Sequence, residues 1–584
     1  MRTLNLGVLA HVDAGKTSLT ERLLHAAGVI DEIGSVDDGT TRTDSLELER
    51  RRGITIKSAV VSFEVGDLTV NLIDTPGHPD FIAEVERVLA VLDGAVLVVS
   101  AVEGVQAQTR VLMRALQRLR VPTLLFVNKT DRAGARPEAV LEQIAAQLSP
   151  AVVGMGAVEA GLLWPELRAE TARAVAHPVF FGSAITGEGV PELIGGIREL
   201  LPSTEADGGG PVAGTVFKIE RGAGGERIAY VRLRSGTIRT RDRIVLPGGE
   251  AKVTAIAPGP VLEAGQIGTL RGLADVRIGD AIGAQDAAGA APQFAPPTLE
   301  TVVTPADAED RGALHAALTQ LAEQDPLIDL RRDELRGELL VSLYGEVQKQ
   351  VVEATLAEEY GLEVAFSAST TICIERLAAS GEAFELIGVD PNPWLATVGL
   401  RLDPAPSGAG VTFALEVERG SMPSAFFTAV EESARAALQA GGNHGWRVPD
   451  CAVTMTHSGY WARQSHSHAT FDKSMSSTAG DFRALTEVVV ARALRAAGTI
   501  VLEPLHRFRL EAPADAVGPL LAVLAELRAV PAAPGPPGLL EGVIPAARVH
   551  ELQQRLPGLT RGEGFLESSF DGYEPVTGPI PSRT

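Results

Sequence analysis

The sequence contains little cysteine and no long stretch free of charge. Its 584 residues include only two cysteines, Cys373 and Cys451, which excludes a disulfide framework and fits a reducing compartment. No uncharged apolar run reaches the ~18 residues that a membrane span needs. His11, Asp13 and Lys16 come too early for the apolar region of a signal peptide. We therefore expect a cytoplasmic protein that is not bound to a membrane.

Positive charge is also scarce. The formal net charge of −22 excludes a protein that coats nucleic acid through its overall charge, although a locally basic face could still bind RNA. At ~150 residues per domain, the length predicts about four domains. Any surface that binds RNA is therefore expected to be a local feature of one domain.

Lysine is the rarer of the two cations. Of the 52 basic residues only seven are lysines, so arginine serves wherever a generic cation is enough. Lys16 and Lys129 both fall inside the motifs described next, where the chemistry asks for an ammonium group on a flexible stem.

The stretch LNLGVLAHVDAGKTSLTERLL predicts a strand, a loop of small residues and an amphipathic helix that begins near Gly15. This order is typical of a phosphate-binding loop, whose backbone N–H groups and helix N-terminus cradle phosphates. Lys16 would reach the β- and γ-phosphates, and Thr17 would hold Mg²⁺. Ala10 stands where the strict pattern has a glycine. An alanine there requires that the backbone has no positive φ at this position. The predicted phosphate-binding residues of this loop are His11, Val12, Asp13, Ala14, Gly15, Lys16, Thr17 and Ser18.

The stretch VNLIDTPGHPDF predicts a strand that ends at Asp74 and a turn that leads to His78. Asp74 would reach Mg²⁺ through water, and the Gly77 N–H could sense the γ-phosphate. Thr55, in RGITI, is suited to closing over Mg²⁺ when the γ-phosphate is present. Both segments are therefore predicted to be switches.

The stretch TLLFVNKTDR ends a buried strand with Asn128, Lys129 and Asp131. The Asp131 carboxylate can accept hydrogen bonds from guanine N1–H and N2–H₂, which adenine does not offer, so the site should select GTP. Ser183 and Ala184, in FFGSAITGEG, are suited to backbone contact with guanine O6.

Each of these motifs alone could be an ordinary turn at the end of a strand. Here all four occur in order, each at the carboxyl end of a predicted strand, where α/β sheets bind their ligands. Together they favour a site for GTP and Mg²⁺.

The motifs AHVDAGKT, RGITI, DTPGH and NKTD together resemble the translational GTPases. The stretch GSVDDGTTRTDSLELERRRGITI is most similar to the tetracycline-resistance ribosomal protection proteins, which are relatives of elongation factor G. The resemblance implies that His78 is the catalytic residue that positions the attacking water. It also implies that the 70S ribosome is the partner and that large-subunit RNA activates hydrolysis. The implied activity is release of tetracycline from the small subunit.

The resemblance runs over the whole chain and implies a multidomain α/β fold. We expect a P-loop GTPase domain, a β-barrel second domain and three α+β sandwich-like domains, in a monomer. The expected boundaries are 1–203 for the GTP-binding domain, 211–288 for the barrel, 297–374 for domain III, 375–501 for domain IV and 502–574 for domain V, with a short tail to 584.

The segment from Lys218 to Arg243 is basic in an acidic protein, with eight basic and three acidic residues. Its alternation predicts a strand with Val231 and Leu233 on one face and Arg232 and Arg234 on the other. The basic face could be a solvated surface, but the resemblance implies that it faces small-subunit RNA.

A polar stretch, GYWARQSHSHATFDKSMSST, follows the predicted strand DCAVTMTH. The resemblance places it at the tip of domain IV, which enters the decoding centre of the small subunit. Aromatic rings there can stack on bases, and basic groups can meet phosphates. The predicted contact residues are Tyr460, Trp461, Arg463, His466, His468, Phe471 and Lys473.

Other interpretations of this tip remain open. A zinc site made by His457, His466, His468 and Asp472 or Cys451 matches no standard spacing, and the segment could also be a disordered loop without a role. Because the resistance proteins usually have a shorter loop here, the chain could instead be an elongation factor G-like paralogue that does not release the drug. A third alternative is a GTP-regulated binding module that does not act on the ribosome.

Overall fold

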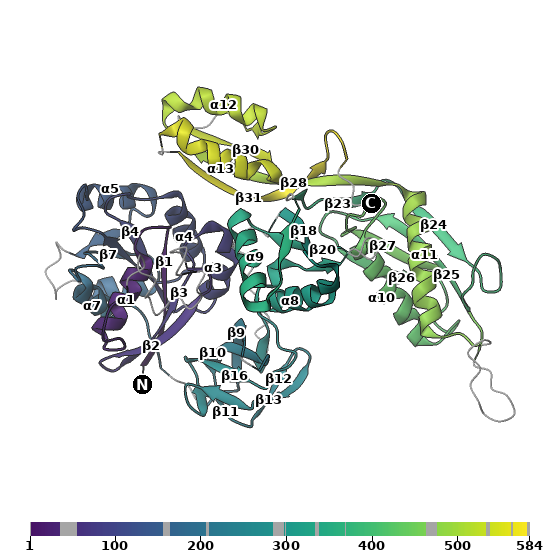
Figure 1. The fold of residues 1–584 in the computed structure, drawn as a ribbon, viewed down its shortest axis with the longest axis horizontal. Coiled ribbons are helices and arrows are strands. Elements are labelled where there is room, and N and C mark those ends of the chain that lie inside the picture. Colours follow the sequence, from purple (N-terminus) through teal and green to yellow (C-terminus); the bar gives the residue numbers. More distant parts are fainter. Residues whose placement is uncertain are drawn as a thin grey trace.

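The structure is a computed structural model of the chain, and Figure 1 shows an elongated molecule with five structural units. We call them domain I (residues 2–205), domain II (209–283), domain III (299–371), domain IV (381–497) and domain V (374–377 and 499–577). Domains I and IV lie at opposite ends of the molecule.

The described residues are 2–34, 49, 55–155, 164–205, 209–222, 224–283, 297, 299–332, 338–367, 370–462, 476–532, 536, 538–561 and 564–580. In these ranges no helix is both long and apolar enough to cross a membrane. The predicted multidomain α/β class is confirmed.

Domain I is an eight-stranded sheet with the order β2-β3-β1-β4-β5-β7-β6, and β8 pairs with β1. The strands are β1 (Arg2–Ala10), β2 (Ala59–Val65), β3 (Leu68–Asp74), β4 (Gly94–Ser100), β5 (Thr123–Asn128), β6 (Val152–Gly154), β7 (His177–Phe181) and β8 (Thr204–Glu205). Strands β3, β1, β4, β5, β7 and β6 run parallel. The central strands read as continuous apolar runs because helices cover both faces of the sheet.

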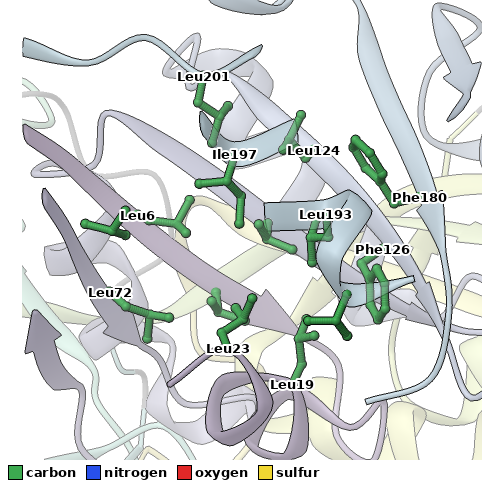
Figure 2. Packing of buried hydrophobic residues seen from close by; sticks show 14 of the residues in the cluster. Leu6, Leu19, Leu23, Leu72, Leu124, Phe126, Phe180, Leu193, Ile197 and Leu201 are labelled. Carbon is green, nitrogen blue, oxygen red and sulfur yellow. The ribbon is translucent and has the colours of Figure 1, made fainter. Parts of the chain in front are cut away.

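The helices of domain I divide between the two faces of the sheet. They are α1 (Lys16–Ala26), α3 (Ile82–Leu89), α4 (Ala107–Arg118), α5 (Pro137–Gln147), α6 (Trp164–Ala172) and α7 (Val190–Leu200). Figure 2 shows one core, where Leu19 and Leu23 of α1 and Leu193 and Ile197 of α7 pack on strand residues such as Leu6. A second core lies between the sheet and α3, α4 and α5. Parallel strands bring their carboxyl ends, and the motifs that follow them, to one edge.

Domain II is built from short antiparallel strands around one apolar core. They are β9 (Ala213–Arg221), β10 (Arg227–Ser235), β11 (Thr237–Arg239), β12 (Arg243–Leu246), β13 (Gly249–Lys252), β14 (Ala255–Ala257), β15 (Val261–Glu263), β16 (Ile267–Arg271) and β17 (Ala281–Gly283). A five-stranded sheet has the order β14-β16-β10-β9-β17, and β11-β15 and β12-β13 form separate pairs. We expected a β-barrel, in which the strands close into one ring. Among the described residues the strand pairs of domain II do not form such a ring.

Half of the basic residues predicted to form an RNA-facing surface bind other domains of the protein instead. Arg232 donates to the Val91 carbonyl and the Asp93 carboxylate of domain I. Arg227 forms an ion pair of 2.6 Å with Glu323 in domain III. The four residues that bind other domains are Lys218, Arg221, Arg227 and Arg232. The expectation of a basic RNA-facing strand was wrong for these four, and the exposed basic residues of the segment are Arg234, Arg239, Arg241 and Arg243.

Domain III packs two helices on a five-stranded sheet. Its elements are β18 (Leu299–Pro305), α8 (Arg311–Gln324), β19 (Arg331–Arg332), β20 (Leu339–Leu343), α9 (Glu346–Tyr360), β21 (Val364–Phe366) and β22 (Thr370–Thr371). Cys373, which follows the domain, is buried.

Domain IV is a four-stranded sheet, with the order β24-β25-β27-β26, covered by two helices. Its elements are β24 (Gly381–Glu385), β25 (Ala396–Pro404), β26 (Val411–Leu415), α10 (Ser424–Ala440), β27 (Cys451–Tyr460) and α11 (Ala479–Ala497). Two neighbouring connections join this domain to domain V, and they bond to each other. Ala378 N–H donates to the Gly498 carbonyl at 3.0 Å, and Ala379 N–H donates to the Ala497 carbonyl at 3.2 Å.

Domain V contains β23 (Ile374–Leu377), β28 (Thr499–Glu511), α12 (Val517–Glu526), β29 (Val530–Pro531), β30 (Leu539–Pro545), α13 (Ala546–Thr560) and β31 (Phe565–Pro575). Strand β23, which lies at the predicted start of domain IV, pairs with the first part of β28. The far end of β28 reaches domain I, where Arg110 of α4 pairs with Glu511 at 2.8 Å. The Arg110 guanidinium also lies 4.4 Å from the centre of the Phe565 ring.

We expect acid to weaken domain V through His506. Burial in β28 lowers the pKa of this side chain to about 4, against an ordinary 6.5. Because the folded state then binds fewer protons than the unfolded state between pH 4 and 6.5, stability falls as the pH falls through that window. The loss at pH 5 is about 2 kcal/mol.

Hydrogen exchange of the amides in β28 and β31 measures this loss. The quantity to compare is the ratio of amide protection in His506→Gln to amide protection in the natural chain. This ratio should be higher at pH 5 than at pH 7. A ratio that does not change with pH would contradict the assignment.

Candidate functional site

A cavity of about 490 Å³ lies at the carboxyl edge of the domain I sheet. It brings together the residues predicted from all the nucleotide motifs. Those that line it are His11, Val12, Asp13, Gly15, Lys16, Thr17, Ser18, Thr55, Gly77, His78, Asn128, Lys129, Asp131, Ser183 and Ala184. Ala14 and Asp74 lie behind the lining, where they bond to Asn128 and Lys16 respectively.

The loop before α1 is shaped to surround an anion. Asp13 and Gly15 have φ of 64° and 88°, in the left-handed region. A Cβ at Gly15 would lie 2.3 Å from Asn128 Nδ2, so space as well as conformation requires glycine there. Helix α1 starts at Lys16, directly after this loop, and its N-terminal amides provide the positive end that phosphates favour.

Oxygen ligands suited to Mg²⁺ gather beside Lys16. The Lys16 ammonium donates to the Asp74 carboxylate and, at 3.1 Å, to Thr55 Oγ1. Thr17 Oγ1 lies 3.4 Å from Thr55 Oγ1, and Thr20 Oγ1 donates to Asp74 Oδ1 at 3.2 Å. Hydroxyl and carboxylate oxygens are the hard donors that Mg²⁺ takes beside nucleotide phosphates. The three residues predicted for the metal, Thr17, Thr55 and Asp74, are therefore placed together and fit the ion.

His78 lines the cavity, and 25% of its side chain is exposed. The Asp80 N–H donates to His78 Nδ1 at 3.2 Å. A neutral imidazole that accepts at Nδ1 carries its proton on Nε2, so this nitrogen can donate to a water or an oxyanion.

His11, in contrast, is buried and neutral. Its Nδ1 lies 3.0 Å from Thr109 Oγ1 on α4. Burial lowers the pKa of His11 to about 4, so it carries no charge at neutral pH. Its side chain therefore adds no positive charge to the phosphate site.

Asn128 links the loop before α1 to the loop that follows β7. Its Nδ2 donates to the Ala14 carbonyl and its Oδ1 accepts from the Ala184 N–H, both at 2.9 Å. Since this N–H is already bound, its predicted contact with guanine O6 would have to be shared with Asn128. Lys129 has a φ of 67° and donates to Glu103 Oε1 at 3.2 Å, and Asp131 is exposed at the cavity.

Five lining residues were not predicted from the sequence: Arg22, Ile33, Gly34, Arg132 and Ile185. Arg22, on α1, donates through Nε to the Ala184 carbonyl at 2.8 Å and also bonds to the Ile185 carbonyl. No motif marks it, because its partners lie more than 160 residues away, at separations of 162 and 163.

The predicted tip of domain IV is described only at its start. Trp461 follows β27 and is 43% exposed. Its backbone N–H donates to Ser477 Oγ at 2.8 Å. Tyr460 is half-buried and packs edge-on against Phe426, with ring centres 5.9 Å apart. Of the two rings, Trp461 is thus the one presented to solvent. The remaining predicted contact residues, Arg463, His466, His468, Phe471 and Lys473, lie outside the described residues.

The zinc alternative gains no support from the part of the tip that can be described. Within the described ranges no three His, Cys, Asp or Glu side chains gather as a metal site. Cys451 is buried in the domain IV core, and His457 stacks on Phe384 with ring centres 4.6 Å apart.

Family models cover most of the chain. Residues 1–203 match the elongation factor Tu GTP binding domain. Elongation factor G domain III matches residues 294–368, domain IV matches 376–498 and the C-terminus matches 500–584. A crystal structure of a Thermus thermophilus protein has the same fold, with a TM-score of 0.64 and 24% identity over 98% of this chain and 97% of that one. Fold and site thus define a GTPase with the domain series of elongation factor G.

Similar proteins narrow this class further. The oxytetracycline resistance protein of Streptomyces rimosus is 48% identical, over 100% of this chain and 97% of its own. The tetracycline resistance protein TetM of Streptomyces lividans is 43% identical, over 97% and 96%. TetP of Clostridium perfringens is 37% identical, over 98% and 95%. The chain belongs to the family of these tetracycline resistance proteins.

Proposed function

We propose that this protein is a ribosome-dependent GTPase that releases tetracycline from the small ribosomal subunit. The observation that carries the proposal is the similarity to the oxytetracycline resistance protein, at 48% identity along the whole of this chain. The nucleotide cavity supports it, because residues from all the predicted motifs meet there.

The cavity supports GTP hydrolysis by positioning. Lys16 would neutralise charge on the β- and γ-phosphates, and His78, with Nε2–H free to donate, would orient the attacking water. Mg²⁺, held by Thr17, Thr55 and, through water, Asp74, would supply further charge neutralisation at the phosphates. Activation of a GTPase by a partner, here the ribosome, raises the rate of hydrolysis by ~10³ to 10⁵, so the protein alone should hydrolyse GTP slowly.

The arrangement of domains supports action at a distance from the nucleotide. Domain IV lies at the far end of the molecule from domain I (Figure 1), and it presents the exposed ring of Trp461 next to the polar tip segment. A ring of this kind can stack on an unpaired base, which is worth ~1 to 3 kcal/mol. We propose the decoding centre as its target, with a monomeric cytoplasmic protein as the acting form.

Retention of labelled tetracycline on ribosomes tests this proposal. Ribosomes loaded with the drug are filtered with and without the protein, in the presence of a non-hydrolysable GTP analogue. We expect the protein to remove most of the label, and a variant lacking residues 461–473 to bind GTP normally but leave the label in place.

The outcomes separate the alternatives. If the label stays while the protein is retained with the ribosomes on the same filter, the protein is a paralogue without drug release. If the protein does not bind ribosomes at all, it is a GTP-regulated module with another target.

A further inference from the structure

Helix α9 of domain III begins without a cap from its own sequence. Its N-cap position is Gly345, which has no side chain to accept from the first N–H groups of the helix. The acceptor comes from domain I, 267 residues earlier, where Asp80 Oδ2 accepts from Val347 N–H at 2.9 Å. The same oxygen accepts from Gln348 N–H at 3.2 Å. A carboxylate is well suited to this position, because it satisfies free N–H groups at the positive end of the helix dipole.

The fit between Asp80 and the start of α9 is close. A Cβ at Gly345 would lie 2.4 Å from Asp80 Oδ1. The φ of Gly345 is −174°, an extended conformation that any residue adopts, so it is the space taken by Asp80 that requires glycine. The next residue, Phe81, packs in a buried cluster with Ile56 and Val351. Figure 1 accordingly shows α9 beside α3 of domain I.

Asp80 also fixes the ring of His78. Its N–H donates to His78 Nδ1 at 3.2 Å, and its Oδ1 lies 3.7 Å from the same nitrogen. One residue therefore caps a helix of domain III with its side chain and sets the imidazole tautomer with its backbone.

We propose that Asp80 is a positioning residue that makes the orientation of His78 depend on the seating of domain III against domain I. The proposal rests on the proposed function, in which His78 orients the attacking water. While α9 is seated, its two N–H groups hold the Asp80 carboxylate, and the Asp80 backbone holds His78. When domain III shifts, that support is lost. GTP hydrolysis is thereby coupled to domain III, although none of the described residues that line the nucleotide cavity belongs to that domain.

Substitutions on either side of the contact test the proposal. Asp80→Ala removes the cap, and Gly345→Ala displaces Asp80 from the domain III side without altering domain I. Each is expected to lower ribosome-stimulated GTP hydrolysis ~10- to 100-fold, the cost of a small misplacement of a catalytic group, while the Kd for GTP stays the same. Glu346→Gln is the matched control, since it removes an exposed carboxylate from the same helix end, and it should leave hydrolysis unchanged. Full hydrolysis in both Asp80→Ala and Gly345→Ala would overturn the proposal.

The His78→Ala background separates positioning from a structural role. If Asp80 acts through His78, Asp80→Ala should cause no further loss in that background. A further loss of the same size would overturn the proposal, because it would show that Asp80 acts by another route. If His78→Ala itself kept full stimulated hydrolysis, the role of His78 in the proposed function would fail first.

Hydrogen exchange at Val347 and Gln348 provides a readout independent of activity. The two amides should exchange faster in Asp80→Ala than in the natural chain, and should keep their protection in His78→Ala. Unchanged exchange in Asp80→Ala would overturn the cap whatever the kinetics show.

Discussion

His78→Ala is expected to lower ribosome-stimulated GTP hydrolysis by ~10³-fold or more, toward the slow rate of the isolated protein. The ring lines the cavity and is fixed through Nδ1, which leaves Nε2–H as the group that can orient water. The Kd for GTP should stay within about twofold, because the phosphate loop and Lys16 supply the binding. Single-turnover hydrolysis with excess ribosomes measures the first quantity, and titration with a fluorescent GTP analogue measures the second.

His25→Ala is the control for this variant. His25 lies on α1 in the same domain, is exposed and does not line the cavity. It should hydrolyse GTP at the normal stimulated rate. Undiminished turnover in His78→Ala would refute the catalytic role.

Asp131→Asn should change the preferred nucleotide from GTP to XTP. The carboxylate of Asp131 lies exposed at the cavity and can accept from the guanine N1–H and amino group. An amide instead donates, which suits the carbonyl that xanthine carries in place of the amino group. Sites built on such bonds discriminate by large factors, so GTP affinity should fall ~10²-fold or more and XTP affinity should rise.

Competition between GTP and XTP for a labelled analogue measures this switch. Asp31→Asn, at an exposed position of domain I outside the cavity lining, should keep the preference for GTP. An Asp131→Asn protein that still prefers GTP would show that another group reads the base.

The nucleotide site could be predicted from the sequence because its parts are local. Each motif is one strand followed by one loop, and parallel strands bring all their carboxyl ends to one edge. The residues from Gly15 to Thr17 and from Asn128 to Asp131 therefore meet in the cavity as predicted.

Contacts between domains could not be predicted in the same way. The alternation in β10 indicated correctly that Arg232 points away from the Val231 side, but not that the partner on that side would be Asp93 rather than RNA. Asp80 and α9 meet across 267 residues, and no spacing pattern marks such a pair. These contacts depend on how folded domains dock, which a local pattern does not encode.

The two bonded connections between domains IV and V have a mechanical consequence. Because two paired segments cross the junction, the orientation of domain IV is tied directly to that of β28, which begins at Thr499. The far end of that strand is Glu511, paired with Arg110 on α4. Thr109, the neighbour of Arg110, lies 3.0 Å from His11 in the cavity wall. Strand β28 thus joins the domain IV junction to the wall of the nucleotide cavity through contacts separate from those of α9 and His78.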